Sequence, residues 1–468
     1  MKWLKDRVKD WLEIVPVGAG SGVSVLSDAD FEREVFRNKV WWRGVVAELA
    51  GFYGGVDDLV GNRSFWAEGG RNRKIRKMHS GLPGMMVDVL ADLTLGDFLG
   101  IRIFNEGLGT ADGVPCQARD DGMGDVWKDI AGENGFEGLL ARAVRTALAL
   151  GDGAFRISFD EGLSSLPIIE FFGADRVRFN YERGRICQVV FVHEGFLEVY
   201  HKDGIRYEAV DEDGCDDLPE DVWHGLGTLL AVPLIFDENP RFAGRGKSVF
   251  DGKTHVFDAL DEVISQWVDA LRDGRVQKYV PSQMLPRDAR TGELKGLSGF
   301  ESRFVQTQMD LAEGADNSVK VVQPAIDTEA LEASFAGFLN LALQGIVAPA
   351  TLGIDLKRGD NATAQREREK ATLYTRGRII DGLRPVLSRL VRAVLVAYDA
   401  MMGEEARGDV VVAVEFGEYA APDFGSQVDV VGKGVAAGII SLETAVEQLY
   451  GDSWTAEQKG EEVARLRV

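Results

Sequence analysis

The chain has 468 residues, 45% of them apolar, which is enough to bury a large core spread over two to four domains. Its formal net charge of −22 argues against a protein that grips nucleic acid by neutralising phosphates. The 3 cysteines are widely spaced and form no Cys-x-x-Cys pair, so we expect inert thiols in a reducing compartment. No apolar run of about 18 residues occurs, and we expect neither secretion nor membrane insertion.

The first third of the chain is predicted to be mainly helical. Between residues 28 and 60, apolar side chains recur at helical spacing until glycines break the pattern. The basic run Arg71–Lys77 follows, which we interpret as a solvated or subunit-facing patch, with a direct DNA contact as the alternative. Another helix is predicted from Gly81, with Pro83 in its first turn.

From Gly153 to about Tyr207 the apolar period changes to two, and short runs are separated by glycines and charged turns. This pattern predicts an antiparallel, β-rich lobe. The acidic segment Asp211–Asp217 lacks the glycine and glutamate positions of an EF-hand and is predicted to be a solvated loop.

Two helices are predicted on either side of a small extended region. The first runs from Asp251 to Arg272 and the second from Asp327 to Leu343, each with one apolar face. Between them, residues 278–285 and 318–324 form two extended pieces around a charged, glycine-rich middle. The first helix also carries carboxylates outside its apolar face, namely Asp258, Asp261, Glu262 and Asp269.

The loop Gly345–Ile354 leads into an unusually long amphipathic helix that continues to Tyr398 and beyond. Asp360 and Asn361 offer capping side chains at its start. At 1.5 Å per residue this helix is roughly 55–60 Å long, which requires a large assembly around it. Pro385 lies inside it and predicts a kink. A strand at 410–416 and a helix at 441–450 follow.

These segments resemble tailed-bacteriophage portal proteins, of the siphovirus type in particular. The resemblance is carried by Gly345–Asp355 together with Asn361–Arg376, which are similar to the tunnel loop and the long helix of that family. It extends in the family's order over most of the chain, from about Phe31 to about Asp452. The other matching words are Arg76–Pro83, Ala149–Phe155, Gly246–Phe250 and Asp258–Trp267.

The resemblance implies an α+β, portal-type fold with long stem and wing helices, a β-rich wing lobe and a small α/β clip. It divides the chain into consecutive regions. These are an N-terminal region and wing (1–250), a descending stem helix (251–273), a clip (274–326), an ascending stem helix (327–345), a tunnel loop (346–361), a long kinked wing helix (362–402), and a wing strand with a small crown (403–468).

The implied function is a structural one, in a ring of about twelve copies at a unique capsid vertex of the virion. The ring would be the channel for dsDNA packaging and ejection, assembled in the host cytoplasm. Its expected partners are other copies, dsDNA, the terminase large subunit, a head-completion or adaptor protein, and the major capsid protein with its scaffold. No membrane and no cofactor are expected, and because a separate terminase would hydrolyse ATP, the chain is not expected to be an enzyme.

The resemblance also assigns candidate site residues. The tunnel loop would present Asp355, Lys357, Arg358 and Asp360 to DNA, with a structural loop of incidental charge as the alternative. Stem residues Asp258, Asp261, Glu262 and Asp269 would face the channel or a neighbouring subunit, and clip residues Tyr279, Val280, Gln283 and Met284 would dock partners. We expect the arginines of the long helix to bind acidic faces of neighbouring subunits rather than DNA.

Two other functions stay open at this point. One is a minor head protein without a central channel. The other is a nucleotide-using enzyme built on Gly246-Lys247-Ser248, although the first glycine of a phosphate-binding loop is replaced by Arg241. The histidines show no zinc-ligand spacing, and no Gly-x-Ser-x-Gly elbow is present, so no hydrolase site is predicted.

Overall fold

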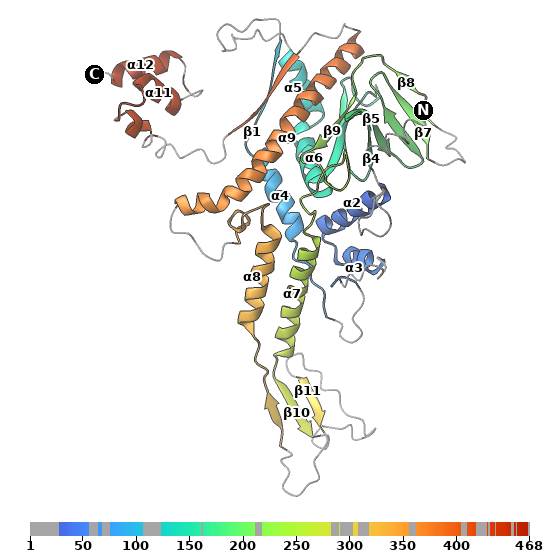
Figure 1. The fold of residues 1–468 in the computed structure, drawn as a ribbon, viewed down its shortest axis with the longest axis vertical. Coiled ribbons are helices and arrows are strands. Elements are labelled where there is room, and N and C mark those ends of the chain that lie inside the picture. The colour runs from blue at the N-terminus through green and yellow to red at the C-terminus, as the bar shows by residue number, and fades with distance from the viewer. Residues whose placement is uncertain are drawn as a thin grey trace, which may run out of the picture. The chain divides into compact units, whose positions relative to one another are not determined.

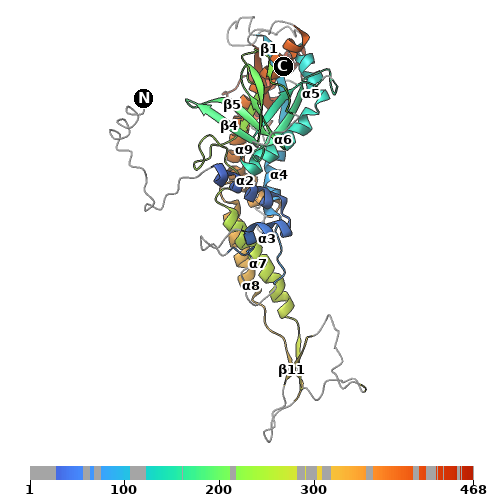
Figure 2. The ribbon, with the colours of Figure 1, turned by 90° about the vertical axis from the view of Figure 1, so that its right-hand side faces the viewer.

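The structure, a computed structural model, has the predicted α+β character and divides into two compact units (Figures 1 and 2). One unit comprises Met1–Gly96 and Ile101–Val414, and the other comprises Asp97–Gly100 and Glu415–Val468. Each unit is described by itself. The residues described are 28–55, 64–67, 75–105, 123–160, 162–210, 218–281, 290, 303–307, 318–354, 362–403, 410–417, 428, 431–435, 437–450, 454 and 456–466.

Helices dominate the beginning of the larger unit, as predicted. They are α2 (Asp28–Arg43), α3 (Val46–Gly55), α4 (Leu82–Leu95), α5 (Met123–Glu133) and α6 (Phe136–Leu150). Helix α6 packs against α4 and the sheet strands β2 (Asp152–Ser158) and β3 (Ile168–Gly173). Its apolar residues repeat at helical spacing, and most are buried, so this helix forms the centre of the core.

The predicted β-rich lobe is confirmed, as two antiparallel sheets. One has the order β3-β2-β9, where β9 is Ala231–Ile235. The other has the order β4-β5-β6-β7-β8, formed by Val177–Glu182, Arg185–Val192, Phe196–Tyr200, Gly204–Ala209 and Val222–Trp223. Gly153 allows β2 and β3 to approach, because a Cβ there would stand 2.4 Å from Cζ of Phe171.

The helices α7 (Thr254–Asp273) and α8 (Thr328–Leu343) lie side by side and form a hairpin (Figures 1 and 2). The chain between them forms a three-stranded sheet of order β11-β10-β12, which we call the tip sheet. Its strands are Gln277–Pro281 (β10), Arg303–Thr307 (β11) and Lys320–Val322 (β12). Strand β10 pairs in parallel with β11 and antiparallel with β12. The sequence did not predict β11.

Helix α9 spans Ala362–Met402, 41 residues, with Pro385 inside, as predicted. It packs against β9, β2 and α4. Its buried face is apolar and includes Leu383, Leu387, Leu390, Val391 and Val394. The one-turn helix η3 (Pro349–Leu352) precedes it. The kink at Pro385 stays a prediction.

The smaller unit contains α11 (Leu442–Tyr450) and α12 (Ala456–Leu466), which pack together. Tyr450 stacks on Trp454 with ring centroids 3.8 Å apart. Strands β1 (Phe98–Asn105) and β13 (Val410–Phe416), most of whose residues belong to the larger unit, pair in a two-stranded sheet. Among the described residues, none of the helices combines the length and apolar character needed to cross a membrane.

Candidate functional site

The α7/α8 hairpin is buried at one end and open to solvent at the other. All buried side chains of α7 lie between Thr254 and Ser265, and those of α8 are Leu339, Ala342 and Leu343 near its end. Other apolar side chains of the hairpin keep part of their surface in water, with Leu271 52% exposed and Leu341 45% exposed. Helices gain most of their stability from packing, so this hairpin has faces that a single chain does not cover.

The hairpin is also strongly acidic. Arg272 is the only lysine or arginine in the helices α7 and α8. Of the carboxylates, Glu329 and Glu332 are exposed, and Glu262 and Asp269 are half-buried. A surface of this charge repels phosphates and does not hold them.

Two of the carboxylates predicted to face the channel or a neighbouring subunit are bound within the chain, which corrects the prediction for the fully buried Asp261; for the half-buried Asp258 it stays a prediction. Asp261 is fully buried and accepts hydrogen bonds from Trp66 Nε1 at 3.2 Å, Ser80 N at 2.8 Å and the His79 ring at 2.7 Å. Asp258 accepts from Ser64 Oγ at 2.6 Å and Phe65 N at 2.8 Å. They anchor residues 64–67 and 75–80 to α7, because buried backbone N–H groups need acceptors.

Residues 75–77, the part of the basic run Arg71–Lys77 that the structure describes, also have a structural role. Lys77 Nζ donates to Trp66 O at 2.9 Å and lies 5.4 Å from the Phe65 ring centroid. Arg76 is exposed. The patch interpretation therefore needs correction at Lys77, which serves the α7 anchor rather than solvent or DNA. Residues 71–74 lie outside the described residues.

The tip sheet carries the predicted docking residues only in part. Tyr279 and Val280 lie in β10, where Tyr279 is half-buried, whereas Gln283 and Met284 lie outside the described residues. Close by, Val319, Val321 and Val322 are 46%, 61% and 44% exposed. Sequence analysis missed these valines, although alternating valines in a short exposed strand could have indicated a contact surface.

The tunnel-loop residues Asp355, Lys357, Arg358 and Asp360 also lie outside the described residues. The chain leading to them is fixed on α9, because Thr372 Oγ1 accepts from Ala348 N at 2.8 Å and lies 3.0 Å from Thr351 Oγ1. Thr372 is buried. The start of this loop is thus tied to the long helix.

The arginines of α9 use partners within the chain at several positions. Arg376 is 8% exposed and its Nε donates to Leu93 O at 3.0 Å. Arg378 lies 3.5 Å from Asp237. The prediction that these arginines bind neighbouring subunits is therefore wrong for Arg376, whose guanidinium joins α9 to α4.

The segment that resembles a phosphate-binding loop is occupied by the protein's own groups. Arg245 forms a bidentate ion pair with Asp152 at 2.9 and 3.0 Å, and Gly246 N donates to the same carboxylate at 2.7 Å. Lys247 N donates to the Asp237 carbonyl at 2.9 Å. Ser248 N donates to Asp251 at 3.0 Å and its hydroxyl donates to a carbonyl of α6. No amide nest is left for a phosphate among these residues.

Burial raises the pKa of Asp152, while Arg245 and the Gly246 amide act in the opposite direction. The guanidinium carbon of Arg245, the partner of Asp152, lies 4.1 Å from the Phe31 ring centroid and 5.0 Å from the Phe179 ring centroid. Sequence analysis did not predict this pair, whose members lie 93 residues apart. It is a structural ion pair that joins β2 to the segment before α7.

A second buried carboxylate, Glu198, joins the two sheets. It is 4% exposed and pairs with Arg156 of β2, with His193 at 3.1 Å and with the Tyr200 hydroxyl at 3.2 Å. Burial, reinforced by Glu198, raises the pKa of Tyr200 well above its ordinary value. The sequence signal was a lone glutamate inside the apolar strand Phe196–Tyr200. We assign this cluster to sheet packing.

Comparison with known proteins gives no family assignment. No protein-family model matches the chain, and neither does any curated protein. Solved structures that are similar include a "Virion of native gene transfer agent (GTA) particle", with 15% identity over 77% of this chain and 87% of that chain and a TM-score of 0.41. A "Neck of native GTA particle computed with C12 symmetry" has 15% identity over 79% and 89%, with a TM-score of 0.41. At this level of likeness we rest the functional proposal on the chain's own residues.

Proposed function

We propose that this chain is a structural subunit of a phage-like virion and, more specifically, a portal-type subunit that forms a ring at one capsid vertex. The ring would be a channel for dsDNA during packaging and ejection. The observation that supports this most is the α7/α8 hairpin, which is acidic, is capped by a small sheet and is buried within its own chain at one end only.

A closed ring of identical copies accounts for the uncovered faces of the hairpin. In a ring, each hairpin has a neighbour on both flanks, so apolar side chains such as Leu271 and Leu341 can be buried between copies. Because each of these leucines is already about half buried in the single chain, covering the rest contributes about 1 kcal/mol per leucine, and the contribution is repeated at every interface. An isolated monomer would leave that surface in water.

The charge of the hairpin agrees with a conduit for DNA. Exposed Glu329 and Glu332 on α8 have no cationic neighbours along that helix. Walls that repel phosphates let a duplex slide, whereas a wall of lysines would hold it with strongly salt-dependent affinity. Weak contacts from Lys357 and Arg358 of the tunnel loop remain part of this proposal.

The tip sheet is the proposed docking platform for the terminase large subunit and for a head-completion or adaptor protein. Strands β11 and β12 are its two edges, and edge strands offer unpaired backbone groups to another chain. The exposed valines of the β12 region add apolar area to that edge. We propose the major capsid protein and its scaffold as further partners of the assembled ring.

The enzyme alternative has little support, because the amides of Gly246, Lys247 and Ser248 all donate to groups of the chain itself. We therefore propose that the chain is not an enzyme. The minor head protein alternative would leave the exposed faces of the hairpin without an explanation.

The experiment that tests the proposal is native mass spectrometry of the purified full-length chain, with negative-stain images of the same sample. A closed ring of about a dozen copies with a central hole is the expected result. A monomer or dimer that persists when scaffold and capsid protein are added would contradict it.

A further inference from the structure

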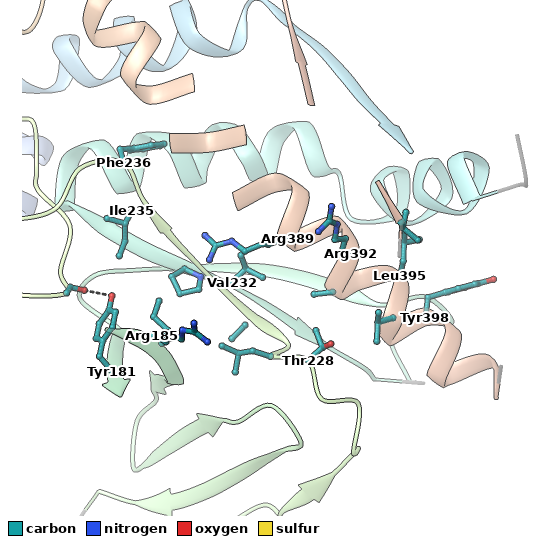
Figure 3. A pocket seen from close by; sticks show the side chains of 18 of the residues that line it. Tyr181, Arg185, Thr228, Val232, Ile235, Phe236, Arg389, Arg392, Leu395 and Tyr398 are labelled. Atoms are coloured by element: carbon teal, nitrogen blue, oxygen red, sulfur yellow. Dashed lines mark hydrogen bonds between the residues drawn. The ribbon is translucent and has the colours of Figure 1, made fainter. Parts of the chain in front are cut away.

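The larger unit contains a cavity of about 900 Å³ between α9 and the strands β4, β5 and β9 (Figure 3). Its volume lies within the range of sites that bind small organic ligands. The floor is apolar and is formed mainly by β9 and α9, with Val232, Pro233, Ile235, Ala393 and Val396. The proposed channel function uses none of these residues.

Three arginines line this cavity, Arg185, Arg389 and Arg392, and the guanidinium groups of the first two enter it from opposite walls. Arg185 extends from the start of β5 and Arg389 from α9, and both point toward the middle of the cavity over Val232 (Figure 3). Within the part of the chain that the structure describes, neither forms an ion pair with a carboxylate. The hydrogen bond of Arg389 Nε goes to the Pro385 carbonyl of its own helix at 3.3 Å.

The electrostatics of the cavity leave these cations without compensation. Burial lowers the pKa of the Arg389 guanidinium, and no carboxylate raises it in opposition. Three acidic residues line the cavity, and none of them forms an ion pair with Arg185 or Arg389: Asp237 lies 3.5 Å from Arg378, Asp399 is 3% exposed and interacts within the chain, and Glu238 is exposed. Both arginines remain open to solvent at the cavity, so an incoming anion can reach them without displacing a carboxylate partner.

We propose that this cavity is a binding site for an apolar ligand that carries one carboxylate. The carboxylate lies between Arg185 and Arg389, whose planar donor groups match its two oxygens, and the apolar part lies on the floor formed by β9 and α9. A polyphosphate or a DNA strand does not fit this arrangement, because its remaining charges would be placed against Val232, Pro233 and Ile235. The same chemistry occurs in a fatty acid and in the C-terminus of an apolar peptide.

Isothermal titration of the full-length chain separates these sources. The probes are octanoate with 1-octanol as its uncharged counterpart, and the tripeptide acetyl-Ala-Leu-Phe with its C-terminal amide. We expect at least one carboxylate probe to bind about tenfold more tightly than its uncharged counterpart, because charge-assisted hydrogen bonds are lost in the latter. Preference for octanoate would identify a fatty acid source, and preference for the free peptide would identify a protein C-terminus. Equal binding of each pair, or binding of no probe, would overturn the proposal.

The double variant Arg185→Gln/Arg389→Gln tests the two named residues. We expect it to lose the preference for the carboxylate while keeping the weak affinity for the uncharged probe, which shows that the cavity is still folded. The matched control is Arg206→Gln, an exposed arginine on β7 of the same sheet that does not line the cavity. An unchanged preference in the double variant, or an equal loss in the control, would refute the assignment.

Discussion

His79 Nδ1 and Asp261 Oδ2 lie 2.7 Å apart, with only 6% and 0% of their side chains exposed. The pair joins residues 75–80 to the buried end of α7. Gly44 packs directly on the histidine ring, where a Cβ would stand 2.7 Å from Cδ2, and its φ of +64° also favours glycine. One end of the proposed channel hairpin is therefore fixed by residues far away in the sequence.

Asp261→Ala should destabilise the protein by about 3–5 kcal/mol, because Trp66, His79 and Ser80 each lose a buried acceptor. Urea unfolding followed by tryptophan fluorescence measures this difference. Asp269→Asn, on the half-buried part of the same helix, is the control and should change stability by less than about 0.5 kcal/mol. Equal effects of the two substitutions would show that Asp261 is not an anchor.

Tyr53 predicts a specific loss of stability at alkaline pH. Trp41 Nε1 donates to its hydroxyl at 2.8 Å, and burial raises the pKa of Tyr53 from 10.0 to about 12. The unfolded chain therefore releases this proton first, so the stability contribution is complete below pH 10 and is lost as the pH rises through about 12. The loss is about 2–3 kcal/mol.

The matched variant is Tyr53→Phe, which should cost about 1–2 kcal/mol at pH 8 because Trp41 loses its acceptor. Its disadvantage should shrink as the pH rises from about 10 to 12, since it has no hydroxyl to ionise. Urea unfolding at both pH values provides the comparison. A constant difference would mean that Tyr53 ionises equally in the folded and unfolded chains.

Arg245→Lys should cost about 1–3 kcal/mol although the charge is kept. A lysine cannot reproduce the bidentate contact with Asp152 or the position between Phe31 and Phe179. Arg178→Lys is the control, because the Arg178–Glu32 ion pair is exposed on both sides. Thermal unfolding of both variants measures this difference. Equal decreases of the two unfolding midpoints would contradict the prediction.

Lys247→Ala should leave stability and nucleotide handling unchanged, because only the backbone N–H of Lys247 is engaged and alanine keeps it. We expect no ATP turnover by the unsubstituted chain in a phosphate-release assay. ATP turnover that disappears in Lys247→Ala would restore the enzyme alternative.

Leu341→Glu should prevent assembly while leaving the single chain folded. The side chain is 45% exposed on α8, so a charge costs little in one chain but must be buried between copies in a ring. Native mass spectrometry and circular dichroism measure the two effects separately. Leu163→Glu is the control, since Leu163 is 77% exposed outside the hairpin. Intact rings in Leu341→Glu would remove this face from the interface.

Periodicity predicted the long elements well. The apolar spacing of α7, α8 and α9 located each helix, since a buried helical face must repeat with its turn. It could not reveal that Asp258 and Asp261 are bound by residues 64–66 and 79–80, because that contact depends on how distant segments fold together. Asp152 and Arg245 were missed for the same reason. Strand β11 was missed because it pairs in parallel and lies within a charged stretch.

The most direct test of the channel proposal is a cryo-electron microscopy reconstruction of the purified assembly. The account predicts a closed ring whose central opening is bounded by α7 and α8, with Glu329 and Glu332 at its surface and Leu341 between neighbouring copies. A ring with the hairpins on its outer rim, or an assembly without a central opening, would contradict it.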